Sequence, residues 1–147
     1  MAHIVGKKVK MGQIFQEENV VPVTFVKLED KEADFTIGEK VKISGKSKGG
    51  GFQGVVKRHR FAGSPKTHGT QHTHRTGGSI GATGPQRVLP GVKMPGRMGQ
   101  TKINLTKVEV MGYEKDQSLL ILKGSLPGMS NAAVSIFKLE EKKKAEK

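Results

Sequence analysis

The sequence predicts a mainly β protein, with a small six-stranded β-barrel body and a long irregular basic loop extension. Short segments rich in Val, Ile, Leu and Phe lie in both halves of the 147-residue chain. No long helical period of apolar residues occurs between them. The middle of the chain is rich in Gly and basic residues instead. This length allows one compact domain with an appendage and excludes two large domains.

Six segments are expected to form the strands of the body. In chain order they are Ile4–Val9, Val20–Glu29, Lys40–Ile43, Thr101–Val110, Ser118–Lys123 and Ala133–Leu139. Branched and aromatic side chains suit the pleated, half-buried surface of a sheet. Six such strands are enough for a small barrel or a sandwich.

The segment that begins at Thr101 requires an irregularity. Its apolar residues form two pairs of opposite parity, Ile103 with Leu105 and Val108 with Val110. A bulge near Thr106 and Lys107 would keep both pairs facing the core. The following residues, Gly112–Gln117, are expected to connect this strand to the next one.

The middle of the chain cannot form a core of its own. Between Gly45 and Gly99 lie 14 of the 20 Gly and four of the six Pro, but only 12 hydrophobic residues. We therefore expect residues 1–44 and 100–147 to form the barrel body. Residues 45–99 are then an extended Gly-rich, basic loop inserted between two strands, and a loop of this length in a compact domain suggests a functional element.

The charge is concentrated in the same region. Residues 40–108 contain fourteen Lys or Arg and no Asp or Glu, whereas residues 1–39 carry a net charge of −2 and residues 109–147 a net charge of +1. A block of one sign repels itself, so a polyanion is the expected counter-charge. A disordered basic linker is the alternative, and nucleic acid is the favoured partner.

Three histidines close together raise the possibility of a metal site. His68, His72 and His74 have a spacing that zinc or copper could use. No carboxylate stands nearby to orient a histidine, and the flanking Lys66 and Arg75 would repel a dication. The Gly49–Gly54 run matches a dinucleotide motif but lacks the strand, helix and acidic residue that such a site needs. We therefore predict no metal, no cofactor and no catalytic residue.

The basic and imidazole side chains of the middle segment are the predicted RNA contacts. Contacts to phosphates, ribose hydroxyls and unstacked bases suit irregular RNA better than a duplex. The predicted set is Lys46, Lys48, Lys57, Arg58, His59, Arg60, Lys66, His68, His72, His74, Arg75, Arg87, Lys93 and Arg97. Phe52 and Phe61 either stack on bases or pack the root of the loop.

Other partner classes have no support in the sequence. The chain has no Cys, which fits a reducing compartment. No window approaches the roughly 18 apolar residues of a membrane span. We therefore expect neither a membrane partner nor a small-molecule substrate.

Several runs together resemble a known family. They are GKSKGGGFQG at Gly45–Gly54, VKR at Val56–Arg58, GSIG at Gly78–Gly81 and GRMG at Gly96–Gly99, and further matches occur at Gly6–Lys8, Gln13–Phe15 and Leu119–Gly124. Their order and spacing resemble the universal large-subunit ribosomal protein L3, in a shortened bacterial-type form. The resemblance covers most of the chain.

The resemblance implies a translation-protein-type β-barrel on large-subunit ribosomal RNA. It also implies a loop that extends toward the peptidyl transferase centre, a role in early subunit assembly, and neighbouring large-subunit proteins as partners. The tip of the loop is expected at Ala82, Thr83, Gly84, Pro85 and Gln86. The expected location is a ribosome in the cytoplasm, with an organellar ribosome left open. Catalysis in this setting belongs to the RNA.

Two departures from the family pattern are visible. Family members usually carry an additional segment before Phe35–Gly38, where this chain has only Asp30–Asp34, so a side lobe is expected to be missing. The tip is one residue shorter than the bacterial pattern, and Gln86 is therefore not equated with the glutamine that some bacterial members methylate. A free nucleic-acid chaperone or compacting protein is the alternative function, and a His-dependent metal enzyme is the third class.

Overall fold

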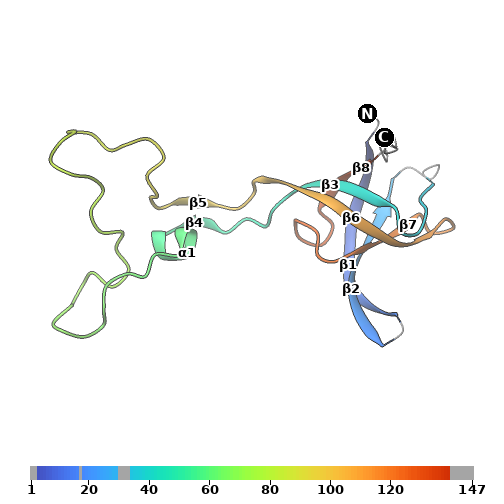
Figure 1. Ribbon diagram of the computed structural model, residues 1–147, viewed down its shortest axis with the longest axis horizontal. Helices are drawn as coiled ribbons and strands as arrows, with labels where there is room; N and C mark the ends of the chain where they lie inside the picture. Colours follow the sequence, from blue (N-terminus) through green and yellow to red (C-terminus); the bar gives the residue numbers. More distant parts are fainter. Residues whose placement is uncertain (1–2, 17, 30–33, 140–147) are drawn as a thin grey trace, which may run out of the picture. The chain divides into compact units, whose positions relative to one another are not determined.

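The computed structural model describes residues 3–16, 18–29 and 34–139. The chain divides into two compact units: unit 1 comprises Met1–Lys48 and Gln100–Lys147, and unit 2 comprises Gly49–Gly99. Unit 1 contains six strands (Figure 1). They are β1 (Ile4–Gln16), β2 (Asn19–Leu28), β3 (Lys40–Lys46), β6 (Lys102–Glu114), β7 (Leu119–Lys123) and β8 (Ala133–Lys138).

The strands of unit 1 form a closed ring in the order β1-β2-β7-β6-β3-β8. Every neighbouring pair is antiparallel. The prediction of a mainly β protein is confirmed, and each of the six expected segments contributes one strand of the ring. Unit 2 is inserted between β3 and β6, which are hydrogen-bonded neighbours.

The core fills the inside of the ring. Alternate residues of β3 and β7 point inward, and Val41, Ile43, Leu120 and Leu122 are fully buried. The buried cluster comprises Val26, Leu28, Phe35, Val41, Ile43, Val110, Leu120, Leu122, Leu126, Val134 and Ile136. Burial of each such side chain contributes about 1.5–3 kcal/mol.

The bulge expected in β6 is present. Val108 pairs with Val41 and Leu105 pairs with Ile43, so two residues of β6 stand opposite one of β3. Lys107 has a left-handed backbone with φ 60°. The extra residue keeps Leu105 and Val108 packed against the core.

The inward position predicted for Ile103 is wrong. Ile103 is 38% exposed and stands opposite Gly45 in β3. Gly45 has no side chain to cover it, and a Cβ there would lie 2.9 Å from Pro127 Cγ. The predicted strand is therefore correct, but its first apolar residue faces solvent.

Three strands are longer than expected, and one of them is β3, which continues from Ile43 to Lys46. β1 continues from Val9 to Gln16, because its distal half pairs with β2 and Gly12 leaves room for the ring of Phe25. β6 continues through Glu114, so the prediction that Gly112–Gln117 is a connection is wrong for its first three residues. A second register shift after Val110 turns Tyr113 toward the core, where its ring packs edge-on against Phe35 at 5.7 Å.

Lys8 is a buried cation that holds one loop of unit 1. Its Nζ donates hydrogen bonds to the carbonyl oxygens of Leu126 at 2.9 Å and Gly128 at 3.3 Å. Its backbone N–H donates to Ala132 O, and its carbonyl accepts from Asn131 N–H. Four hydrogen bonds thus fix the loop before β8 to β1.

Replacing Lys8 by Met is expected to lower the free energy of unfolding by about 1–3 kcal/mol, because two carbonyls lose their donor. Burial, and then the charge of Lys48, lower the pKa of Lys8 from 10.5. Just below pH 10.5 the unfolded chain therefore binds more protons than the folded chain, so wild-type stability rises with pH there. The difference in the free energy of unfolding between the wild type and Lys8→Met should therefore be larger just below pH 10.5 than at neutral pH.

Urea unfolding at about pH 7 and about pH 10 measures both effects. Lys27→Met, at an exposed lysine of β2, is the control and should change stability by less than about 0.5 kcal/mol. Equal stability of the Lys8→Met variant and the wild type at both pH values would contradict the role given to Lys8.

Unit 2 contains regular structure where an irregular loop was expected. β4 (Gly51–Gln53) pairs with β5 (Gly96–Met98), and α1 (Val55–His59) follows β4. These elements are three to five residues long, too short to produce a periodic pattern. The connection Asp30–Asp34, where the resemblance implies a missing lobe, lies outside the described residues except for Asp34.

Candidate nucleic-acid interface

Helix α1 places two of the predicted contact residues beside residues 94–96 of unit 2. Arg58 Nη1 donates a hydrogen bond to Met94 O at 2.7 Å, and His59 Nε2 lies 3.1 Å from the same oxygen. A Cβ at Gly96 would lie 2.6 Å from Arg58 Nη1. The glycine therefore makes room for the guanidinium, and both side chains are half-buried. They join residues 55–59 to residues 94–96.

A second contact closes the segment that contains the histidines. His74 Nδ1 lies 3.2 Å from Pro65 O, and Ser64 N–H donates to His74 O at 3.2 Å. Gly63 has φ 76°, and a Cβ there would lie 2.1 Å from His74 O. No residue other than glycine fits this close approach without a shift of the backbone.

The three histidines do not form a common site. His68 and His72 are exposed, whereas His74 is half-buried. Within residues 3–16, 18–29 and 34–139, no group of three or more His, Asp or Glu side chains is placed to hold a metal ion.

Most predicted contact residues are exposed. The exposed members are Lys46, Lys48, Lys57, Arg60, Lys66, His68, His72, Arg75, Arg87, Lys93 and Arg97. Lys46 lies in β3, Lys57 in α1 and Arg97 in β5, while Arg60 caps the C-terminus of α1 with φ 61°. Regular elements therefore position part of the set, and irregular backbone carries the rest.

The two units differ in how their cations are neutralised. In unit 1 the Lys115 and Lys123 ammonium groups donate hydrogen bonds to Asp34 and Glu109, and these contacts lower the pKa of each carboxyl. The carboxylates thus remain charged and offset lysines locally. Unit 2 has eight Lys or Arg and no carboxylate. Its cations need a counter-charge from outside the unit.

The predicted tip is exposed throughout. Ala82–Gln86 carries no charged side chain. Ser79 Oγ donates to Gly81 O at 2.9 Å before it, and Arg87 N–H donates to Pro85 O at 2.8 Å after it. Local hydrogen bonds thus shape both flanks of the segment.

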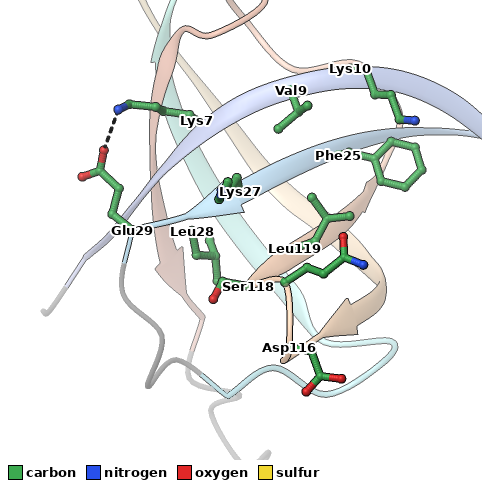
Figure 2. Close-up of a pocket in the computed structure, with 11 residues that line it drawn as sticks. Lys7, Val9, Lys10, Phe25, Lys27, Leu28, Glu29, Asp116, Ser118 and Leu119 are labelled. Atoms are coloured by element: carbon green, nitrogen blue, oxygen red, sulfur yellow. Dashed lines mark ion pairs between the residues drawn. The ribbon is translucent and has the colours of Figure 1, made fainter.

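Unit 1 has its own pocket, of about 940 Å³, beside β1, β2 and the turn between β6 and β7. Figure 2 shows Lys7 paired with Glu29, with Nζ 3.4 Å from Oε1. Lys10 Nζ lies 5.4 Å from the centroid of the Phe25 ring, and Asp116 lines the pocket as well. Because carboxylates are mixed with the lysines, this surface suits a polyanion less well than unit 2 does.

A closed ring of strands with a basic, carboxylate-free insertion between two neighbours is an arrangement suited to nucleic-acid binding. Residues 1–117 match the family model described as "Ribosomal protein L3". The chain therefore belongs to the ribosomal protein L3 family, as the sequence runs predicted. This family is a structural, non-enzymatic component of the ribosome.

Bacterial relatives show the same membership. "Large ribosomal subunit protein uL3" of Carboxydothermus hydrogenoformans is 45% identical over 102 residues, which are 69% of this chain and 48% of the relative. The uL3 protein of Heliobacterium modesticaldum is 39% identical over 128 residues, 86% of this chain and 60% of the relative. That of Dehalococcoides mccartyi is 40% identical over 129 residues, 86% and 63% respectively. The chain spans about half to two thirds of the length of these relatives.

The described part of the chain contains no helix with the length and apolar character that a membrane crossing requires.

Sequence reasoning missed a pocket in unit 2, which is lined in part by Val55, Phe61, Gly77 and Met94. The Gly77-Gly78 pair was a usable signal for a close approach of the backbone. Its partner Val55 is distant in sequence, and no local pattern connects the two.

Proposed function

We propose that this protein is a structural constituent of the large ribosomal subunit that binds large-subunit rRNA mainly through unit 2. The observation that carries the proposal is the set of eight Lys or Arg in Gly49–Gly99 without a single carboxylate. Lys46 and Lys48 add two more cations immediately before unit 2 in the chain. The chain's membership of the L3 family supports rRNA as the polyanion.

The finer roles follow from the family. We propose that the ring of strands is the translation-protein-type β-barrel, seated on rRNA beside neighbouring large-subunit proteins. The protein acts early in subunit assembly, and unit 2 extends toward the peptidyl transferase centre. In a bacterium its place is the ribosome of the cytoplasm, and an organellar ribosome is the alternative.

Co-sedimentation tests this proposal. A tagged full-length chain, expressed in a bacterium, should sediment with large subunits and remain with them through a salt wash. A free nucleic-acid chaperone or compacting protein would instead bind duplex DNA and rRNA with similar affinity and stay outside the subunit fraction. That result would overturn the proposal.

Deletion of Thr83–Gln86 is expected to leave subunit incorporation largely intact while altering peptide-bond formation or the binding of inhibitors at that centre. The tip carries no charge and contributes little to affinity, because phosphate contacts come from the cations on either side. Its glycine and proline define a tight backbone path that suits close approach to RNA. Purified subunits that contain the variant supply both measurements. Lys27→Gln, at an exposed lysine of unit 1 outside the predicted contact set, is the control and should leave both values unchanged. Normal values for both activities would mean that the tip is only a turn.

A further inference from the structure

Unit 2 contains an open pocket of about 630 Å³, a size typical of sites for small organic ligands. Val55, Phe61 and Ile80 form part of its apolar lining. Arg75 and Lys93 are its charged lining residues. All of these residues belong to unit 2.

The pocket is open because a glycine stands where a side chain would fill it. A Cβ at Gly77 would lie 3.6 Å from both methyl groups of Val55 and 3.9 Å from the Phe61 ring. Val55 is only 5% exposed, so its side chain is packed against its neighbours. Ile80 is 54% exposed, so part of the apolar lining of the pocket is open to solvent.

The chemistry of the lining points to one kind of occupant. An aromatic ring and aliphatic side chains suit a flat, uncharged group, and the exposed Arg75 and Lys93 suit an anion attached to it. Unit 2 has no carboxylate to compete for these cations. We propose that this pocket takes one unstacked RNA nucleotide, with its base against Phe61 and Val55 and its phosphate toward Arg75 and Lys93. The inference rests on the proposed function and adds a specific nucleotide site to it.

Filling the pocket with a side chain tests the inference. Gly77→Val places two methyl groups in the space beside Val55, and the backbone of Gly77 is not in the left-handed region. Gly81→Val is the matched control, because Gly81 is also outside that region and a Cβ there meets nothing within 4 Å. Phe61→Leu is a second test that removes the stacking ring while keeping an apolar side chain.

The readout is the NMR shift of the Val55 and Ile80 methyl groups in the full chain, titrated with AMP, adenosine or inorganic phosphate. AMP should shift these signals in the wild type and in Gly81→Val. Its affinity should fall by about tenfold in Phe61→Leu and in Gly77→Val. Equal AMP affinity in the wild type, Gly77→Val and Phe61→Leu would overturn the inference. Equal shifts with phosphate alone would also overturn it, because they would indicate only an anion site.

The salt dependence of rRNA binding, measured on the same variants, separates this inference from the proposed function. If the wild type binds rRNA with a steep salt dependence but the AMP affinity of Gly77→Val equals that of the wild type, only the assignment of the pocket fails. If the wild type shows no salt dependence, the proposed function itself fails.

Discussion

A chain in which Asn-Gly replaces residues 48–100 is expected to lose rRNA affinity by about 10²- to 10³-fold near 0.1 M salt, while its ring of strands stays folded. The replacement removes all eight cations of unit 2 together with Lys48. If half of the eight each neutralise one phosphate, they contribute a slope of about −3 in the logarithm of affinity against that of salt concentration. Their removal should flatten the dependence by that amount.

The ring should tolerate this replacement because β3 and β6 are already hydrogen-bonded to each other next to the replaced residues. Ser47 N–H donates to Thr101 O at 2.9 Å, and the two hydroxyls lie 3.2 Å apart. The pairing continues inward through Lys46 and Lys102. An Asn-Gly turn is the favoured two-residue connection for such an antiparallel pair.

Fluorescence anisotropy of a labelled large-subunit rRNA fragment, at several salt concentrations, measures the effect. The double variant Lys10→Gln/Lys27→Gln, at exposed lysines of unit 1, is the control and should reduce the slope by no more than about 2. Circular dichroism and thermal unfolding establish that the shortened chain is folded. An unchanged slope in a folded variant would mean that unit 1 carries the main RNA contact.

The strands could be predicted because their signals are local. Val41 and Ile43, like Leu120 and Leu122, alternate with residues that face outward. The bulge at Lys107 was predictable because one strand contained two parities. The extension of β1 through Gly12 was not, because it depends on Phe25, which lies across the hairpin.

The basic residues of unit 2 could be found from charge, but their surroundings could not. Arg58 and Lys57 are neighbours in the same basic run, yet only Arg58 reaches Met94 O. This contact depends on the absence of a side chain at Gly96, 38 residues later in the chain. Charge patterns predict a partner, whereas the packing that orients each cation depends on tertiary contacts.

Ile43→Ala is expected to lower the free energy of unfolding by about 3–4 kcal/mol, with a fall in the melting temperature of roughly 15–25 °C. Ile43 is fully buried, and its neighbours across the two adjacent strands are Leu105 and Ile136. The truncated side chain leaves a cavity in the core of the ring. Ile43→Val removes one methylene group and should cost about 0.5–1.5 kcal/mol.

The same variant tests whether incorporation requires the folded ring or only the charge of unit 2, because Ile43→Ala leaves all eight cations of unit 2 in place. Salt-dependent binding to an rRNA fragment should therefore persist with an unchanged slope at a temperature where the ring is folded. Incorporation into large subunits at growth temperature should fall sharply for Ile43→Ala and only slightly for Ile43→Val, because incorporation requires a ring that presents a fixed surface. Calorimetry and co-sedimentation supply the two measurements. Normal incorporation of a variant whose ring has melted would show that charge alone brings the chain into the subunit.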